Sequence, residues 1–362
     1  MKSKPAIAVI GLKGLPAFGG AAAVGENIIR QLHYDYDFTV YSASSHTNLQ
    51  TGNYEGICTQ VVFRSMGYKK LNTLMYYLKS LFHALLSGNY DLVHLHHRDA
   101  AFIVPLLRLR YKVVLTTHGM ILTEKWEKYT SLFEIQDKLF LRFVNRITAV
   151  SLKDLRFLQK VLPRRKDMVH IPNGVNGINR LSPKLQRITF AAGRIVPAKG
   201  CHLFLEAMKN TNCDHEILII GDYSQVSDYS QHLKVLSASV KNIRFTGLIK
   251  DKNQLFELIG HSEFFVYPSL IESMSMVMLE VASLGVPIIC SRIPENLDVF
   301  NEDEVLYFEP GNILDLRNKI KFAFSYPDNM QERSEKAMHK LVNFYLWQDI
   351  AQKYSSVYNS IL

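Results

Sequence analysis

Short apolar runs alternate with amphipathic segments along most of the chain, and this alternation limits the possible folds more than any other feature. Runs such as AIAVIG at 6–11 and KVVLTT at 112–117 are largely apolar, which is typical of strands buried on both faces of a parallel sheet. Between them lie segments with helical spacing of apolar residues, such as 71–87. This alternation predicts an α/β fold with parallel sheets.

The alternation occurs in two series, separated by a stretch at 172–186 that is rich in Pro, Gly and Asn and is typical of a linker. The first series has predicted strands at 6–11, 38–42, 57–63, 91–96, 112–117, 147–150 and 168–171, and helices at 22–32, 71–87, 99–110, 132–145 and 152–160. The second has predicted strands at 188–192, 216–220, 243–246, 263–267 and 287–291, and helices at 201–209, 252–259, 275–284, 312–324, 330–343 and 346–361. We therefore expect two doubly wound, Rossmann-like domains, residues 1–175 and 176–345.

Size and composition agree with a globular protein of two domains. The chain has 362 residues, of which 48% are hydrophobic and 21% charged. The first apolar run continues into a glycine loop, unlike a signal peptide, and the stretch 74–86 is interrupted by Lys79 and His83. The four cysteines are far apart and form no CxxC pair, so reduced core thiols are expected. A cytoplasmic protein is the resulting expectation.

The net charge of +9 is concentrated in the first half of the chain. Residues 1–175 hold 23 Lys and Arg against 12 Asp and Glu, whereas residues 176–362 hold 19 against 21. The first domain is therefore expected to face an anionic surface or substrate. No nucleic-acid recognition motif accompanies the charge, so nucleic acid is not the expected partner.

In doubly wound folds ligands bind beyond the carboxyl ends of the strands, so the loops there are the candidate sites. The first such loop holds Gly19 and Gly20 before a predicted helix, where the backbone can approach an anion, although a tight turn would give the same pattern. His118, in TTHGM, follows another strand and is either a cleft residue or a structural histidine. The histidines of VHLHH at 93–97 end another strand, where successive residues point to opposite faces, and no carboxylate cluster joins them, so a metal site is not expected.

The stretch GRIVPAKG at 193–200 places Arg194 and Lys199 in a loop after the first strand of the second domain. A planar guanidinium and a mobile ammonium offer complementary contacts to a diphosphate. On this spacing alone the two residues are equally compatible with a solvated loop.

The stretch YPSLIESMSMVMLEVASLGVPIIC at 267–290 has the pattern strand, loop, helix, glycine stop and strand. Glu272 lies in the loop and Glu280 in the helix. Eight residues of helix rise about 12 Å, so the two carboxylates are not expected to share a proton. They suit contacts at two ends of an elongated ligand, with the helix N-terminus between them, or they are two unrelated surface glutamates.

Together these motifs resemble the retaining family 4 glycosyltransferases of GT-B fold. The resemblance rests on Glu272-x7-Glu280, on GR…KG about 75 residues earlier and on IPNGV at the domain junction, and it covers nearly the whole chain. The opening GLKGLPAFGG is similar to the subgroup that contains rhamnosyl- and other polysaccharide-assembling transferases. Two Rossmann-like domains facing across a cleft are implied, with a last helix, 346–362, that packs back on the first domain.

The resemblance implies a function and a role for each motif residue. The enzyme is expected to move a sugar from a nucleotide-diphosphate sugar to a hydroxyl of a glycan or lipid-linked glycan, with retention, in cell-surface polysaccharide assembly. The implied catalytic residues are His118, Arg194, Lys199 and Glu272. The implied donor-binding residues are Gly19, Gly20, Arg194, Lys199, Glu272, Ser273, Met274, Ser275, Met276, Val277 and Glu280.

Within this set Arg194 and Lys199 bind the donor diphosphate, Glu280 the ribose and Glu272 the sugar hydroxyls. The family usually has a glycine-rich segment where this chain has Ser273-Met274-Ser275. Serine still offers its backbone N–H, but Met274 is bulky and the loop is stiffer, so the identity of the sugar is left open.

No cofactor or metal is expected, because the GT-B fold typically uses Arg and Lys at the diphosphate. Asp35-Tyr36-Asp37 matches a DxD metal motif literally, but it precedes a predicted strand instead of ending one.

The expected partners are the sugar donor, a glycan or lipid-diphosphate-linked acceptor and, through the basic first domain, an anionic membrane surface on the inner face of the cell membrane. Candidate membrane contacts are Lys69, Lys70, Arg108, Arg110, Lys112 and Arg164–Lys166.

Three other functions remain open at this point. A nucleotide-sugar epimerase of GT-B type would share the fold and the donor but need no acceptor. A dinucleotide oxidoreductase is suggested by the two Rossmann-like domains. However, this chain lacks the GxGxxG fingerprint of such enzymes, and that function would leave Glu272 and Glu280 unexplained. A non-catalytic sugar-nucleotide sensor would keep Arg194, Lys199 and Glu280.

Overall fold

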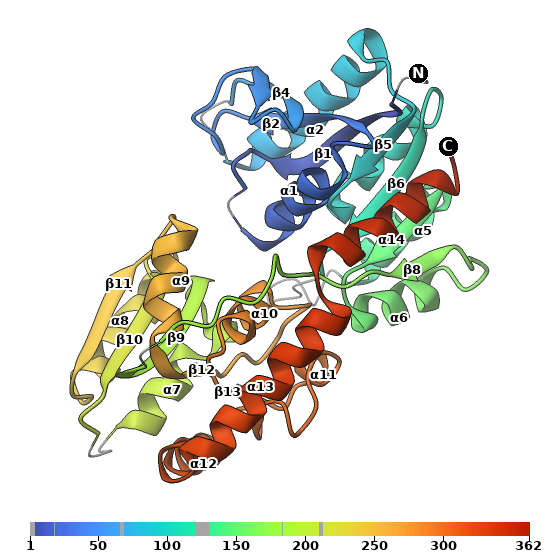
Figure 1. The fold of residues 1–362 in the computed structure, drawn as a ribbon. Coiled ribbons are helices and arrows are strands. Elements are labelled where there is room, and N and C mark those ends of the chain that lie inside the picture. Colours follow the sequence, from blue (N-terminus) through green and yellow to red (C-terminus); the bar gives the residue numbers. More distant parts are fainter. Residues whose placement is uncertain (1–3, 18, 66–68, 120–129, 183, 210–212) are drawn as a thin grey trace. The chain divides into compact units, whose positions relative to one another are not determined.

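The structure is a computed structural model that describes residues 4–17, 19–65, 69–119, 130–182, 184–209 and 213–362. The chain divides into two compact units, Met1–Asn173 with Trp347–Leu362, and Gly174–Leu346. Each unit is a sheet of mainly parallel strands with helices on both faces (Figure 1). The predicted fold class, α/β with two doubly wound Rossmann-like domains, is confirmed.

The first unit has an eight-stranded sheet in the order β3-β4-β2-β1-β5-β6-β7-β8. Its strands are β1 (Ala6–Lys13), β2 (Asp37–Ala43), β3 (Gly52–Tyr54), β4 (Cys58–Phe63), β5 (Leu92–Leu95), β6 (Lys112–Thr117), β7 (Arg146–Ala149) and β8 (Met168–His170). All pairs are parallel except β3 with β4. The strand order reverses beside β1, so the loops after β1 and β5 lie at the point where such sheets bind ligands.

Helices cover both faces of this sheet. They are α1 (Gly20–Leu32), α2 (Lys69–Ser87), the 3-10 helix η1 (Arg98–Ile103), α3 (Val104–Leu107), α5 (Thr130–Phe140), the 3-10 helix η2 (Leu141–Phe143) and α6 (Leu152–Val161). The last helix of the chain, α14 (Trp347–Asn359), belongs to this unit and packs against α1. The predicted helix at 99–110 is in fact η1 followed by α3, with Pro105 in the first turn of α3.

The second unit has a six-stranded, fully parallel sheet in the order β11-β10-β9-β12-β13-β14. Its strands are β9 (Leu185–Arg194), β10 (Glu216–Asp222), β11 (Ile243–Gly247), β12 (Ser262–Tyr267), β13 (Ile288–Ser291) and β14 (Leu306–Phe308). Its helices are η3 (Pro197–Lys199), α7 (Cys201–Met208), α8 (Ser227–Ser237), α9 (Lys252–Gly260), α10 (Met276–Ser283), α11 (Pro294–Leu297), α12 (Ile313–Ser325) and α13 (Pro327–Phe344).

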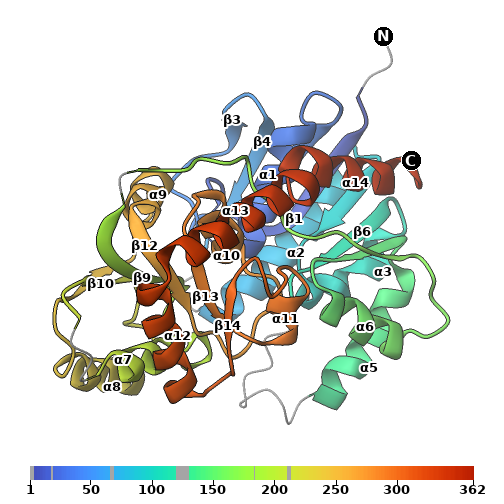
Figure 2. The ribbon, with the colours of Figure 1, turned by 60° about the horizontal axis from the view of Figure 1, so that its bottom comes forward.

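Alternate residues of the central strands build two separate cores on the two faces of this sheet. On one face Phe264 and Val266 of β12 pack with α7, α8 and α12. On the other face Phe265 and Tyr267 pack with α9, α10 and α13. Helices α10 and α13 lie side by side on this second face (Figure 2). Burial on both sides explains why these strands are continuously apolar in the sequence.

Candidate functional site

The loop GRIVPAKG connects the end of β9 to α7. Strand β9 ends at Arg194, η3 forms one 3-10 turn, and Gly200 has a positive φ of 70°. A Cβ on Gly200 would lie 1.9 Å from the carbonyl oxygen of Pro268. Glycine is therefore required at this position, both for the backbone angle and for the close approach of the next loop.

The loop after β12 is tied directly to the loop after β9. The N–H of Leu270 donates to the carbonyl of Ala198 at 2.8 Å. Strands β9 and β12 are neighbours in the sheet, so their carboxyl ends meet. The two loops thus form one continuous surface at the centre of the sheet edge.

Glu272 is the centre of a polar cluster on this surface. The Lys199 ammonium lies 2.5 Å from Glu272 Oε1, and the hydroxyls of Ser269, at 2.5 Å, and of Tyr267 donate to the same oxygen. The Glu272 side chain is only 7% exposed. Burial and the neighbouring carboxylate raise the pKa of Tyr267 well above its ordinary value, so this phenol stays a donor. All three contacts fall on Oε1, and no described residue donates a hydrogen bond to Oε2.

Glu280 has a different partner. The Lys252 ammonium, from α9, lies 2.8 Å from Glu280 Oε1. Glu280 lies in α10, which begins after Ser275, whose hydroxyl accepts from the N–H of Met278 at 3.3 Å. The two glutamates therefore have separate lysine partners.

The N-terminus of α10 lies between the two glutamates along the chain. The residues that lead into it are half-buried: Ser273, Met274, Ser275, Met276 and Val277. Within the part of the chain that the structure describes, Ser275 accepts from one N–H group of the first turn, that of Met278, so the N–H groups of Met276 and Val277 can donate to an anion. The structure brings Lys199, Glu272 and this helix start into one loop surface.

Arg194 is the last residue of β9 and its side chain is exposed. Its guanidinium makes no hydrogen bond or ion pair with the part of the chain that the structure describes. Its neighbour in the sheet is Asp222 at the end of β10, whose carbonyl accepts from the N–H of Ile195 at 2.8 Å. The guanidinium is thus available to a ligand at the same strand edge.

Gly19 and Gly20 lie in the first unit, at the start of α1. Gly19 is the N-cap, with φ of 113°, and Gly20 is the first helical residue. The preceding loop is held by the buried Glu26, whose Oε2 accepts from the N–H of Ala17 at 2.7 Å. Its Oε1 accepts from the Tyr54 hydroxyl at 2.9 Å. A buried carboxylate therefore fixes the approach to the glycine pair.

His118 follows β6 in the first unit and is half-buried. Its Nε2 lies 3.1 Å from Nδ1 of His96, and the two rings are stacked with an interplanar angle of 12°. Burial and the neighbouring histidines lower the pKa of both rings well below the ordinary value. Both are therefore neutral at pH 7, and one donates its N–H to the other.

The predicted site residues fall into two groups, one in each unit. Gly19, Gly20 and His118 belong to the first, and Arg194, Lys199, Glu272, Ser273, Met274, Ser275, Met276, Val277 and Glu280 belong to the second. Among the described residues no group of three or more His, Cys, Asp or Glu is arranged to hold a metal ion.

Comparison with known families decides the class of the chain. Residues 18–176 match the model described as Glycosyltransferase Family 4, and residues 179–340 match the model described as Glycosyl transferases group 1. Together the two matches cover most of the chain. The chain is a glycosyltransferase of GT-B fold.

Curated relatives of this glycosyltransferase are distant. A phosphatidyl-myo-inositol mannosyltransferase from Mycobacterium leprae is 25% identical over 291 residues, 76% of this chain and 75% of the relative. A UDP-Gal:alpha-D-GlcNAc-diphosphoundecaprenol alpha-1,3-galactosyltransferase from Escherichia coli is 28% identical over 246 residues, 60% of this chain and 62% of the relative. The capsular polysaccharide biosynthesis glycosyltransferase CapH from Staphylococcus aureus is 23% identical and covers 78% of this chain and 80% of the relative.

Solved structures share the fold over the whole chain. Sucrose-phosphate synthase from Thermosynechococcus elongatus aligns with a TM-score of 0.86 at 18% identity, over 99% of both chains. HepE from Anabaena, in complex with UDP and glucose, aligns with a TM-score of 0.80 at 17% identity, over 98% of this chain and all of the other.

Several residues of the candidate site were not predicted from the sequence. Tyr267 and Ser269 hold Glu272, Lys252 holds Glu280, and His96 contacts His118. Tyr267 and Ser269 lie in the YPS segment directly before Glu272, and this proximity was a usable signal. Lys252 is 28 residues from Glu280 in sequence, and only the packing of α9 on α10 brings them together.

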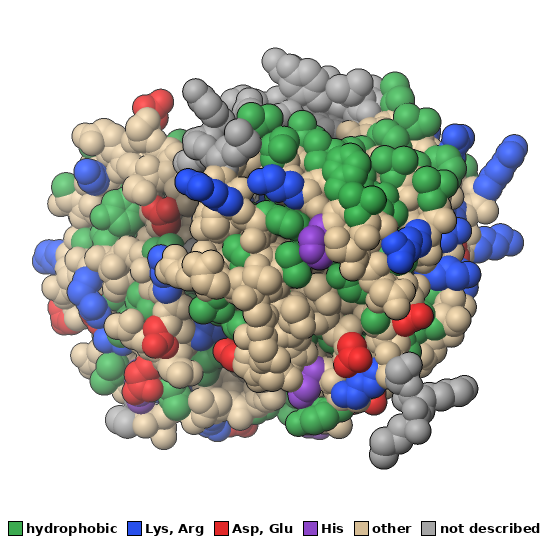
Figure 3. All heavy atoms as spheres, turned by 90° about the horizontal axis from the view of Figure 1, so that it is seen from above, with side chains coloured by type: hydrophobic (Ala, Val, Ile, Leu, Met, Phe, Trp, Pro, Cys, Tyr) green, Lys and Arg blue, Asp and Glu red, His purple; other side chains and the backbone are tan. Residues whose placement is uncertain are grey.

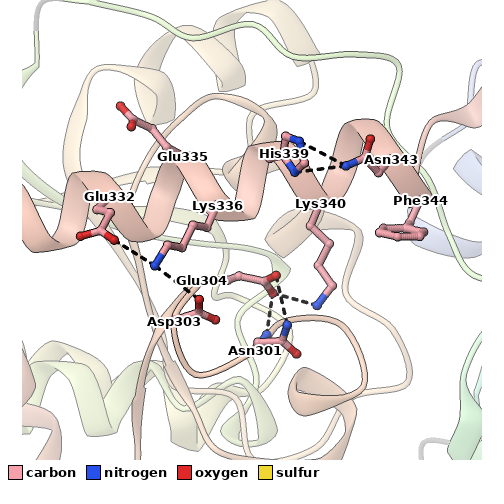
Figure 4. A pocket seen from close by; sticks show the side chains of 10 residues that line it. All are labelled: Asn301, Asp303, Glu304, Glu332, Glu335, Lys336, His339, Lys340, Asn343 and Phe344. Atoms are coloured by element: carbon pink, nitrogen blue, oxygen red, sulfur yellow. Dashed lines mark hydrogen bonds and ion pairs between the residues drawn. The ribbon is translucent and has the colours of Figure 1, made fainter.

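A pocket of about 600 Å³ lies elsewhere in the second unit, between α13 and the turn before β14 (Figure 4). Its charged groups pair with one another: Lys336 points between Glu332, at 2.9 Å, and Asp303, at 3.4 Å, while Lys340 lies 2.8 Å from Glu304. None of the sequence-predicted site residues lines it. Among the described helices, none has the length and apolar composition needed to cross a membrane.

Proposed function

We propose that this glycosyltransferase moves a sugar from a nucleotide-diphosphate sugar to a hydroxyl of a glycan or lipid-linked glycan, with retention of configuration, in cell-surface polysaccharide assembly. The observation that carries the proposal is the cluster in which Lys199, Tyr267 and Ser269 converge on one oxygen of Glu272, beside the start of α10.

The cluster suits a donor with a diphosphate and a sugar. Lys199 and the exposed Arg194 supply two cations, and the start of α10 supplies N–H groups, which together match the charge of a diphosphate. Oε2 of Glu272 is oriented by the three contacts on Oε1 and is a suitable acceptor for a sugar hydroxyl. Glu280, eight residues further along, is a suitable acceptor for the ribose.

The proposed chemistry places most of the catalytic effect on the leaving group. The bond between the anomeric carbon and the diphosphate breaks, the acceptor oxygen bonds to that carbon, and the acceptor proton passes to the departing phosphate. Charge develops on the diphosphate, where Arg194, Lys199 and the helix start stabilise it without reorganising. His118 is proposed to contact the donor sugar. No protein nucleophile and no metal is assigned.

The relatives support the donor and acceptor classes. HepE has been solved with UDP-glucose, and the name of the Escherichia coli relative specifies a UDP-sugar donor and a diphosphoundecaprenol-linked acceptor. CapH takes part in capsular polysaccharide biosynthesis. For this chain we propose a nucleotide-sugar donor, a glycan or lipid-diphosphate-linked acceptor, and a location at the inner face of the cell membrane.

The alternatives are less well supported. All of the relatives described above are transferases, which disfavours an epimerase, and the glycine loop lacks the dinucleotide fingerprint of an oxidoreductase. A non-catalytic sensor would keep the same donor contacts.

The test is a thermal-shift screen against nucleotide-diphosphate sugars, followed by an assay of nucleotide release with and without candidate acceptors. A ligand at 100 times its Kd stabilises the folded state by about 2.7 kcal/mol. Release that depends on the acceptor supports transfer. Turnover without an acceptor indicates an epimerase, and binding without turnover across the acceptor panel indicates a sensor.

Replacing either cation tests its role at the diphosphate. We expect Arg194→Ala and Lys199→Ala each to lower the transfer rate by about 100-fold, as for the loss of one fixed donor at a developing charge. The control is Lys234→Ala, which removes an exposed lysine of α8. This helix does not belong to the loops after β9 and β12. Full transfer by either of the first two variants contradicts the assignment.

A further inference from the structure

Helix α2 is apolar on both of its faces. Its inner face packs on the sheet through Tyr76, Tyr77, Leu81 and Ala84. Its outer face carries exposed apolar residues at helical spacing, namely Leu71, Leu74, Phe82 and Leu86, and Leu86 is 80% exposed. A surface helix normally has one polar face, so an apolar outer face indicates that a partner covers it.

The exposed apolar surface continues onto α3 and the turn after it. Leu106 of α3 and Leu109 of the turn are exposed, and Leu109 is 80% exposed. Arg110 joins this turn to α2, because its guanidinium donates to the carbonyl of Leu85 at 2.5 Å. We call the surface made of Leu71, Leu74, Phe82, Leu86, Leu106 and Leu109 the outer α2 face.

The charge around the outer α2 face is almost wholly positive. Residues 56–123 contain eight Lys and Arg, of which Arg98 is paired with Asp137, and only two carboxylates, Asp91 and Asp99. Both carboxylates already accept protein hydrogen bonds, from the N–H of Ala6 and from the hydroxyl of Tyr77. A space-filling view shows hydrophobic side chains gathered together with Lys and Arg along their edge (Figure 3).

Cations flank the outer α2 face at two places. The Lys79 ammonium donates to the carbonyl of the exposed Arg64 at 3.0 Å, which brings two cations together beside the middle of α2. Arg108, Arg110 and Lys112 follow one another around the turn after α3. Apolar side chains that are flanked by cations, on a helix without carboxylates, match the apolar interior and anionic headgroups of a bilayer surface.

We propose that the outer α2 face docks on an anionic membrane surface, with its apolar side chains in the headgroup boundary and the flanking cations on the lipid phosphates. The docking itself is argued from the surface alone. Its biological purpose rests on the proposed function, since docking would hold the enzyme where a lipid-linked acceptor lies. A membrane fits better than a protein partner, because the surface offers charge of one sign and apolar area but few directed hydrogen-bonding groups.

The test compares binding of the full chain to vesicles of phosphatidylcholine alone and of phosphatidylcholine with phosphatidylglycerol. We expect binding to the anionic vesicles only, and weaker binding at high salt. The variant Leu74→Ser/Phe82→Ser should bind at least about tenfold more weakly, because two apolar side chains leave the bilayer boundary. The matched control is Leu314→Ser/Phe344→Ser, which removes an exposed Leu and Phe, 64% and 62% exposed, from the second unit.

Three results would overturn the proposal: equal binding to neutral and anionic vesicles, equal loss in the control variant, or unchanged vesicle binding by Leu74→Ser/Phe82→Ser. Loss of a dimer in that variant, with vesicle binding unchanged, would show that a second copy covers the face instead. Nucleotide release with a water-soluble acceptor separates this proposal from the proposed function. Nucleotide release should be the same in Leu74→Ser/Phe82→Ser as in the unmodified chain. If the unmodified chain releases no nucleotide, the proposed function is rejected, whereas the proposed membrane docking is not.

Discussion

At the scale of single residues, the hydrogen bond to His96 determines whether Nδ1 of His118 is a donor or an acceptor. If His96 donates to Nε2 of His118, then His118 has its proton on Nδ1 and donates to a ligand. If His118 donates to His96, its Nδ1 is a bare acceptor. Both rings are neutral, so the hydrogen bond fixes one of these two states. His96 is therefore a positioning residue for His118.

Replacing His96 tests this coupling. We expect His96→Phe to lower kcat about tenfold with little change in KM, because His118 loses the hydrogen bond that sets its tautomer, and metal-bound histidines that lose such a partner lose activity by at least about this factor. His96→Asn should restore much of the rate, because its amide reaches the place of Nδ1. Steady-state kinetics of both variants measure this. An unchanged kcat in His96→Phe, or an equal loss in both variants, would argue against positioning.

The buried His94 predicts how stability depends on pH. Its Nε2 contacts the Thr116 hydroxyl at 2.7 Å, its Nδ1 contacts the Tyr358 hydroxyl at 2.8 Å, and burial lowers its pKa from 6.5 to about 3. The folded state thus binds fewer protons than the unfolded state. Stability is full above the unfolded pKa and is lost as the pH falls below it.

Between pH 6.5 and 5 this one group should remove about 2 kcal/mol of the free energy of unfolding. We expect His94→Gln, which keeps a donor and an acceptor but does not titrate, to show a correspondingly smaller loss. Denaturant unfolding at pH 7.5 and at pH 5 measures both chains. Parallel losses in the two would place the acid sensitivity in other residues.

At the scale of elements, the loops after β9 and β12 act as one unit. Gly200 allows their contact, since its φ is positive and a Cβ would collide with the carbonyl of Pro268. The contact places Lys199, at the end of η3, against Glu272. In the motif GR…KG, Gly200 is therefore needed for packing, in addition to the two cations Arg194 and Lys199.

The two glycines of GRIVPAKG separate these requirements. We expect Gly200→Ala to destabilise the fold by at least about 1–2 kcal/mol, the cost of a left-handed backbone angle for alanine, and to lower transfer as the two loops move apart. Gly193→Ala is the control, because a Cβ there has no atom within 4 Å. Thermal unfolding of both variants decides. Equal stability of the two would mean that the loops are not in contact.

The sequence predicted the elements that have a strong pattern and missed those that do not. The strands β9, β10 and β12 were expected because they are buried on both faces and therefore continuously apolar. The three-residue strands β3 and β14 and the polar helix α8 were not expected, since a short run or a weakly amphipathic helix gives little periodic signal. They are fixed by pairing and packing with distant segments.

From the sequence, the candidate site could be predicted only where its residues lie at the predicted ends of strands. Arg194 ends a strand, and Lys199, Glu272 and His118 follow strands, as the sequence indicated. Their partners were not predictable, because a hydrogen bond such as that between Lys252 and Glu280 depends on how two helices pack.

At the scale of the whole molecule, the chain forms its first unit from two separate segments. Helix α14 ends the chain but packs against α1, and its Tyr358 hydroxyl contacts the buried Nδ1 of His94 in β5. Tyr36 contacts the same helix, with its hydroxyl 2.9 Å from that of Ser355. The first unit is therefore complete only when the last helix has been made.

Removing one contact of α14 should weaken the first unit selectively. We expect Tyr358→Phe, which leaves Nδ1 of His94 buried without its partner, to cost about 1–3 kcal/mol. Hydrogen exchange should then be about 5- to 150-fold faster at the most protected amides of β5 and β6, because opening of this unit exposes them. Amides of β12 and β13, in the second unit, should be unaffected.

The control is Tyr326→Phe, at an exposed tyrosine of the second unit, which should change the exchange of neither set of amides. Equal acceleration in both units would instead show that the two open together as one cooperative body.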